Sequence, residues 1–145
     1  MLAGDAGEYG AGGYSLTGEL DAEIEISYDE LQLEAVQSHQ FHSTRRELDC
    51  LHRMLVVLTE RVPGTLRGQR VTYLTDSLAA FEWVMGMRAR DPADLGRILQ
   101  IYDLCHAWDL ELNVVWTARG RPVDTAGDVA RSCLLVRRQR RATPR

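Results

Sequence analysis

The 145-residue sequence predicts an α/β fold, in which a mixed five-stranded sheet combines an antiparallel meander with parallel strands and carries helices on both faces. Two observations support this. Three strand patterns follow one another at the start of the chain, as in a meander. Beyond residue 42, strand patterns alternate with helix patterns, which requires parallel pairing through right-handed crossovers. The length is that of one domain, expected over residues 1–135.

The meander is expected within the first 34 residues. Residues 2–20 contain two extended pieces on either side of the turn-forming stretch GEYG. In the next segment, Ile24, Ile26 and Tyr28 alternate with polar residues, which is typical of a strand with one wet face. Residues 29–34 are expected to be strand or loop.

Residues 42–64 carry the clearest helix pattern. Ser43 or Thr44 is expected to cap it, because a hydroxyl accepts from the free backbone N–H groups of the first turn. Pro63 and Gly64 are expected to end it. Its apolar stripe consists of Leu48, Leu51, Leu55 and Leu58.

The remaining patterns alternate between strand and helix. Strands are expected over residues 69–75 and 110–116, and helices over residues 77–87, 91–109 and 122–135. The middle helix starts with Asp91 as a cap and Pro92 at the first helical position. Its expected apolar face consists of Leu95, Ile98, Leu99, Tyr102 and Cys105.

The composition predicts a protein inside the cell, in the cytoplasm or nucleus. No apolar run reaches the roughly 18 residues of a membrane span, and the first residues lack the pattern of a signal peptide. Cys50, Cys105 and Cys133 are widely spaced, with no CxxC pair, which predicts reduced and mostly buried thiols.

The net charge of −4 argues against a dedicated nucleic-acid-binding protein, but the charge is unevenly distributed. Acidic residues crowd residues 19–34, whereas the last 15 residues contain six arginines and no acid. Residues 136–145 are therefore predicted to be a disordered tail or linker, which binds nucleic acid, acts as a nuclear localisation signal or is simply solvated.

Four acidic residues stand out by their positions: Asp5, Glu47, Asp76 and Asp128. Asp76 directly follows a strand and shares the face of Leu74, at the carboxyl end where ligands gather in open α/β sheets. Glu47 heads the face of its helix that carries Leu51. Each acid also has an ordinary explanation: a disordered terminus for Asp5, and a dipole, cap or solvated position on the helices for the others.

Converging carboxylates favour a divalent metal. A buried carboxylate is costly unless it is paired or bound to a metal, and several of them repel one another. Mg²⁺ prefers oxygen ligands and leaves positions open for substrate phosphates. Two such ions stabilise the attacking and leaving oxygens of a phosphoryl displacement, so clustered acids point to phosphodiester chemistry.

Four stretches resemble successive blocks of a ribonuclease H domain: GDAGEYGAGGYSL, STRRELDCLHRML, VTYLTDSLAAFEWVMGM and VVWTARGRPVDTAGDVARS. They are most similar to the ribonuclease H of retroelements, of the DIRS-like or long-terminal-repeat type, which accompanies a reverse transcriptase in the polyprotein. The resemblance spans residues 3–132. It implies a ribonuclease H-like fold and suggests that the chain is excised from a longer polyprotein.

The resemblance also implies a catalytic site. Asp5, Glu47, Asp76 and Asp128 would bind two Mg²⁺ ions, with Mn²⁺ as a substitute, and cleave the RNA strand of an RNA–DNA hybrid. Asp124 stands where the family often has asparagine and is the alternative to Asp128 as a ligand. Residues 118–123 lack the histidine found there in many members. The implied substrate contacts are Gly7, Ser43, Arg46, Ser77, Arg119 and Arg121.

Two alternatives remain open at this stage. The domain could be a catalytically inactive ribonuclease H-like module that binds hybrid or spaces polyprotein domains. It could also be a nuclease or recombinase of the same fold that acts on DNA, although a glutamate between the first two aspartates favours the ribonuclease H arrangement.

Overall fold

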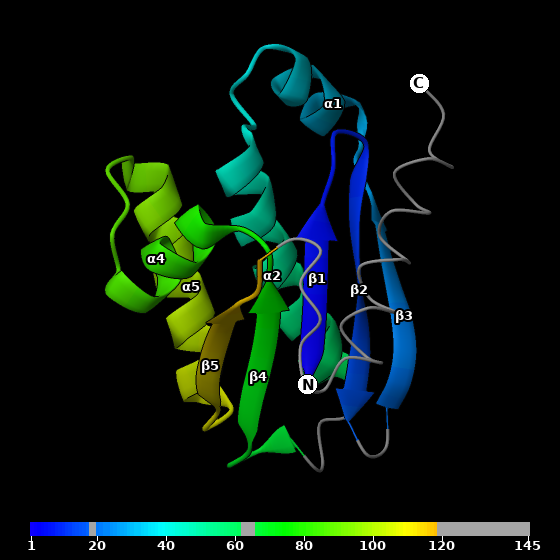
Figure 1. Ribbon diagram of the computed structural model, residues 1–145, viewed down its shortest axis with the longest axis vertical. Coiled ribbons are helices and arrows are strands. Elements are labelled where there is room, and N and C mark those ends of the chain that lie inside the picture. Colours follow the sequence, from blue (N-terminus) through cyan, green and yellow to red (C-terminus); the bar gives the residue numbers. More distant parts are fainter. Residues whose placement is uncertain (18–19, 62–65, 119–145) are drawn as a thin grey trace.

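The structure, a computed structural model, describes residues 1–17, 20–61 and 66–118 of the chain. Its centre is a five-stranded sheet (Figure 1). The strands are β1 (Leu2–Ala6), β2 (Gly10–Thr17), β3 (Leu20–Ser27), β4 (Arg70–Thr75) and β5 (Glu111–Trp116). Their order is β3-β2-β1-β4-β5, so the strand that begins the chain lies in the middle of the sheet.

The strand directions confirm the predicted mixed sheet. β1 pairs antiparallel with β2, and β2 pairs antiparallel with β3, which forms the meander. β4 pairs parallel with both β1 and β5. The register sets Leu2 opposite Tyr73 and Ala3 opposite Leu74 across the parallel β1–β4 pair. The carboxyl ends of β1 and β4 therefore lie at the same edge of the sheet.

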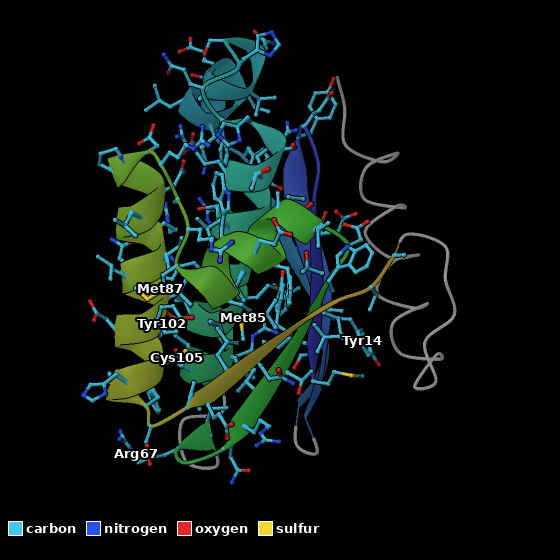
Figure 2. The ribbon with its side chains drawn as sticks, turned by 60° about the vertical axis from the view of Figure 1, so that its left-hand side comes forward. Tyr14, Arg67, Met85, Met87, Tyr102 and Cys105 are labelled. Carbon is cyan, nitrogen blue, oxygen red and sulfur yellow. The ribbon has the colours of Figure 1, made fainter. Side chains whose placement is uncertain are left out.

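Four helices complete the described fold: α1 (Glu30–Gln37), α2 (Ser43–Arg61), α4 (Leu78–Gly86) and α5 (Pro92–Ala107). α2 packs across β1 and β2, α4 packs against β4 and β5, and both α4 and α5 contact α2. Tyr102 on α5 donates to the carbonyl of Val84 on α4 (2.7 Å), and Figure 2 shows it with Cys105 on the inner side of α5. These helices share one core with Leu2 and Tyr73 of the sheet.

The opposite face of the sheet carries a smaller cluster around Ala3 and Leu74. The helix expected over residues 122–135 and the tail over residues 136–145 lie outside the described residues, as does Cys133. Cys50 and Cys105 are buried free thiols, as predicted. Within the described part of the chain, every helix is too short or too polar to cross a lipid bilayer.

Helix α1 was not predicted, because residues 29–34 were expected to be strand or loop. Asp29 caps it: its side chain accepts from the backbone N–H of Gln32 (2.8 Å), and the side chain of Gln32 accepts from the N–H of Asp29 (3.0 Å). This reciprocal capping box satisfies two backbone donors that the helix start would otherwise leave free. The alternation that predicts the strand ends at Tyr28, one residue before this cap.

Helix α2 begins one residue earlier than its predicted caps allow. Ser43 is already helical, so neither it nor Thr44 is the cap. Instead, Nδ1 of His42 accepts from the backbone N–H of Arg45 (3.3 Å). The end predicted at Pro63 and Gly64 lies outside the described residues. All four leucines of the predicted stripe are buried: Leu48, Leu51, Leu55 and Leu58.

Helix α5 has the predicted cap, but part of its predicted face is wrong. The side chain of Asp91 accepts from the backbone N–H of Ala93 (2.8 Å), with Pro92 next in the helix. Leu99 is 45 % exposed. The buried stripe advances in steps of four, three and four residues through Asp94, Ile98, Ile101 and Cys105. Leu99 lies one position beyond Ile98 and so points away from the core.

Two glycines allow α2 to lie close to the sheet. A Cβ on Gly4 would clash with the hydroxyl of Tyr73 and lie 3.0 Å from Sγ of Cys50. A Cβ on Gly13 would clash with the backbone carbonyl of Ala3 and lie 2.5 Å from Cε of Met54. These glycines therefore leave room for the side chains of α2, which brings the first turns of that helix near the end of β1.

Candidate metal centre

Two of the candidate acids lie side by side at the carboxyl edge of the sheet. Asp5 is on β1, and Asp76 directly follows β4. The parallel register pairs Ala3 with Leu74, and Asp5 and Asp76 each lie two residues beyond this pair. Asp76 itself lies just past the last residue of β4. The parallel pairing of β1 with β4 therefore brings the two acids to the same edge of the sheet.

The third acid, Glu47, comes from the buried side of α2. Its Oε1 accepts a hydrogen bond from the backbone N–H of Ala6 (3.1 Å), one residue beyond Asp5 on β1. One carboxylate oxygen from each of Asp5, Glu47 and Asp76 lies within 4.8 Å of the others. The structure thus brings together three of the four acids that the sequence singled out, from segments distant along the chain.

Burial makes this cluster electrostatically unfavourable without a cation. Asp5 and Glu47 are each only 8 % exposed. Burial above all, and next the hydrogen bond and the charge of Asp5, hold the pKa of Glu47 well above its ordinary value, while the N–H of Ala6 acts in the opposite direction. Beneath the site, burial also raises the pKa of the Cys50 thiol, which therefore stays neutral.

A divalent cation fits these donors. Oε2 of Glu47 is buried and has no hydrogen-bond partner among the described residues, although a buried carboxylate oxygen normally has one. A cation shared by the three carboxylates would satisfy it and offset their mutual repulsion. Hard oxygen ligands of this kind suit Mg²⁺ or Mn²⁺ rather than a soft metal.

Replacing Glu47 with glutamine should separate stability from metal binding. The amide keeps an oxygen for the N–H of Ala6 but removes one of the clustered charges. Because burial and Asp5 disfavour the ionised form of Glu47, the melting temperature of the metal-free Glu47→Gln protein should rise at neutral pH, by about 2–5 °C. Addition of Mg²⁺ should raise the melting temperature of the wild type but not that of the variant.

Differential scanning fluorimetry in chelator and in Mg²⁺ measures both effects. Glu60→Gln is the matched control, since Glu60 is an exposed acid on the same helix, and it should behave as the wild type does. A Glu47→Gln protein that is less stable than the wild type without metal would contradict the electrostatic account.

The residues on either side of Asp76 form hydrogen bonds at the end of β4 and the start of α4. Oγ of Ser77 accepts from the N–H of Ala80 (3.1 Å) and caps α4, so the alternative explanation of Asp76 as the cap is wrong. Oγ1 of the buried Thr75 accepts from the N–H of Ser77 (3.1 Å). Thr75 is not among the residues singled out from the sequence, although its place just before Asp76 on the inward face of β4 is a usable signal.

The other proposed substrate contacts are only partly described. The N–H of Gly7 donates to the carbonyl of Gly10 (2.7 Å) in the turn after β1. Ser43 is exposed at the start of α2. Arg46 is half-buried, and its Nε has no hydrogen-bond partner among the described residues. Four predicted site residues lie outside the described part: Arg119, Arg121, Asp124 and Asp128.

No protein-family model and no curated protein sequence matches the chain. Solved structures do resemble it. Ribonuclease H1 of the halophilic archaeon Halobacterium salinarum NRC-1 matches with a TM-score of 0.59 and 13% identity, over 94% of this chain and 92% of that chain. LC11-RNase H1, isolated from compost by a metagenomic approach, matches with a TM-score of 0.61 and 16% identity, over 94% and 91%.

A third similar structure is the N-terminal ribonuclease H domain of rv2228c from Mycobacterium tuberculosis, solved as a fusion with maltose-binding protein. It matches with a TM-score of 0.53 and 17% identity, over 90% of this chain and 91% of that chain. At these identities the likeness concerns the backbone, and it agrees with the mixed sheet and the strand order. The fold of this chain is therefore the ribonuclease H-like fold predicted from its sequence.

Proposed function

We propose that this chain is a divalent-metal-dependent ribonuclease H, which hydrolyses the RNA strand of RNA–DNA hybrids. The observation that carries the proposal is the convergence of Asp5, Glu47 and Asp76, with one buried oxygen of Glu47 lacking a hydrogen-bond partner among the described residues. The fold, shared with three ribonuclease H structures, supports it as well.

The carboxylates of Asp5, Glu47 and Asp76 would hold the metal, with Asp128, or alternatively Asp124, as the fourth ligand. Two Mg²⁺ ions, or Mn²⁺ in their place, supply an activated water and charge stabilisation at the leaving oxygen when bound. The protein orients the ligands. The N–H of Ala6 holds one oxygen of Glu47, and strand pairing holds Asp5 beside Asp76.

The substrate would be recognised by its shape. A hybrid duplex is A-like, and its wide minor groove displays the 2′-hydroxyls that distinguish RNA from DNA. Contacts along the backbone would supply affinity without sequence preference. The side chains and N–H groups proposed for this role are those of Gly7, Ser43, Arg46, Ser77, Arg119 and Arg121.

The retroelement context is also part of the proposal. It rests on the sequence blocks around Asp5, Glu47 and Asp76 and on their likeness to the ribonuclease H of retroelements. The domain would then remove the RNA template inside the cell, linked to a reverse transcriptase in the same polyprotein.

The direct experiment is hydrolysis of a labelled RNA–DNA hybrid. With Mg²⁺ or Mn²⁺, we expect cleavage of the RNA strand, with 5′-phosphate products, and no cleavage in chelator. Double-stranded DNA should remain intact, which separates this activity from that of a DNA nuclease of the same fold. A folded protein that binds hybrid but leaves the RNA intact under all metal conditions would contradict the proposal and indicate an inactive module.

A further inference from the structure

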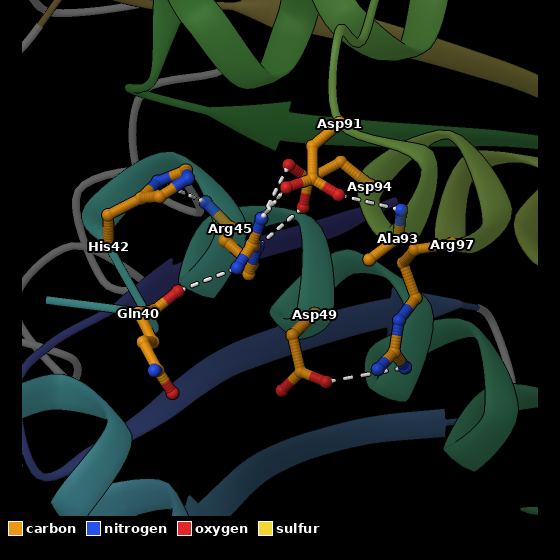
Figure 3. A network of polar contacts seen from close by, with 8 residues as sticks. All are labelled: Gln40, His42, Arg45, Asp49, Asp91, Ala93, Asp94 and Arg97. Atoms are coloured by element: carbon orange, nitrogen blue, oxygen red, sulfur yellow. Dashed lines mark hydrogen bonds and ion pairs between the residues drawn. The ribbon is translucent and has the colours of Figure 1, made fainter. Parts of the chain in front are cut away.

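Arg45, adjacent to the proposed substrate contact Arg46, is partly exposed, and its guanidinium forms hydrogen bonds to three other residues of the protein (Figure 3). Its Nε and Nη2 donate to the two oxygens of Asp94 at 2.6 and 3.0 Å. Nη2 also donates to Oδ2 of Asp91 (3.1 Å), and Nη1 donates to the carbonyl of Gln40 (2.7 Å). One guanidinium thus ties the start of α2 to the segment before it and to the start of α5.

The tie to Asp94 is the strong part of this network. Asp94 is only 2 % exposed, and a paired guanidinium fork matches both of its oxygens. The hydrogen bond to Asp94 is also the main reason why the pKa of Arg45 is raised. Asp91 simultaneously caps α5 through its other oxygen. The position of Arg45 is therefore fixed relative to the first turn of α5.

The first turn of α2 is weakly capped. Its cap is the imidazole of His42, at a distance of 3.3 Å, and it contains no acidic side chain to complement the helix dipole. Glu47 lies only two residues after Arg45 and must approach both Ala6 and Asp5 from this turn. A small shift of the turn would therefore move the carboxylate of Glu47 relative to the sheet.

We propose that Arg45, braced by Asp94 and Asp91, is a positioning residue that sets the place of Glu47 in the metal centre. The inference rests on the proposed function, because its expected effect is on the affinity for the catalytic metal. We call the contacts of Arg45 with Asp94 and Asp91 the brace. Removing a group that orients a metal ligand without touching the metal commonly lowers the metal affinity by 10- to 100-fold.

A second contact between α2 and α5 provides a matched control. Arg97 of α5 pairs with Asp49 of α2 (3.4 Å) and also contacts Nδ1 of His52 (2.9 Å). Asp49 keeps a second partner, Arg53, on its own helix (3.1 Å). Arg97→Gln thus breaks a contact between the same two helices without touching the network of Arg45.

Isothermal titration with Mg²⁺ tests the proposal on the folded protein. Arg45→Lys keeps the charge but loses the fork, and it should weaken Mg²⁺ binding about 10-fold. Asp91→Asn, whose amide oxygen can still cap α5, is a milder variant and should weaken binding by a smaller factor. Arg97→Gln should leave the affinity within about twofold of the wild type, because Asp49 keeps its partner Arg53 and the contacts of Arg45 are left in place.

Hybrid cleavage supplies a second readout. In Arg45→Lys, the Mg²⁺ concentration for half-maximal activity should rise by the same factor, while the rate at saturating Mg²⁺ and the KM for hybrid stay unchanged. A residue that contacts substrate would instead raise that KM.

The outcomes are distinguishable. Equal losses of Mg²⁺ affinity in Arg45→Lys and Arg97→Gln, or no loss in either, would show that the brace only stabilises helix packing. If Arg45→Lys fails to fold, Asp91→Asn decides by the same criterion. A folded wild-type protein that binds no Mg²⁺ would overturn the proposed function together with this inference, whereas normal wild-type binding with unchanged variants overturns the inference alone.

Discussion

Asp5→Asn should reduce the rate of hybrid cleavage by roughly 10³-fold or more. Asp5 lies on the central strand, one of its carboxylate oxygens lies within 4.8 Å of an oxygen of Asp76, and its carboxylate also interacts with Glu47. An asparagine keeps the shape but supplies a neutral oxygen, so the site would hold metal more weakly and lose transition-state charge stabilisation. The measurement is single-turnover cleavage of a labelled hybrid at saturating Mg²⁺.

Glu8→Gln is the matched control for this loss. Glu8 is an exposed acid three residues from Asp5, in the turn between β1 and β2, and its removal should leave the cleavage rate unchanged. Circular dichroism should show that both variants are folded. Cleavage by Asp5→Asn at the wild-type rate would mean that the carboxylate cluster is not the catalytic centre.

Gly13→Ala should lower the free energy of unfolding by about 1–3 kcal/mol, the usual range for overpacking a dense core. The added methyl group would meet the backbone carbonyl of Ala3, which cannot rotate away, and Cε of Met54, which is fully buried. Either α2 would have to move outward or the β1–β2 pair would have to distort. Urea denaturation measures the change.

Gly96→Ala provides a control of opposite sign. Apart from its chain neighbours and the backbone of its own helix, no atom of the described residues lies within 4 Å of a Cβ built on Gly96, in the interior of α5. Alanine is the better helix former, so this change should raise the free energy of unfolding by up to about 1 kcal/mol. If Gly13→Ala is as stable as the wild type, α2 does not depend on a glycine for its close approach to the sheet.

Much of this fold can be predicted from local sequence patterns. The period-two alternation around Ile24 and the leucine stripe of α2 identify their elements, because each reflects a single buried face. Caps were harder to predict. Asp29 starts a helix directly after a strand, and a ring nitrogen of His42 replaces the expected hydroxyl of Ser43. Such choices depend on which acceptor lies nearest to the free N–H groups of the first turn, and several side chains compete for that place.

The candidate site also contains both residues that the sequence can identify and residues that it cannot. Asp76 could be singled out by its place at a strand end, and Glu47 by its place at the head of an apolar stripe. Arg45 could not be singled out from the sequence, because its acidic partners are 46 and 49 residues away. Nothing local distinguishes it from Arg46, and only the packing of α5 on α2 determines which of the two arginines is engaged.

The central position of β1 has a consequence for the order of folding. β1 can pair with β2 as soon as a local hairpin forms, but its other neighbour, β4, begins more than 60 residues later. Closing such a long loop is slow compared with forming hairpins and helices. Asp5 and Asp76 meet only when this last pairing is made. Metal binding should therefore report formation of the β1–β4 pair, and a partly folded chain that contains only the meander and α2 should lack the site.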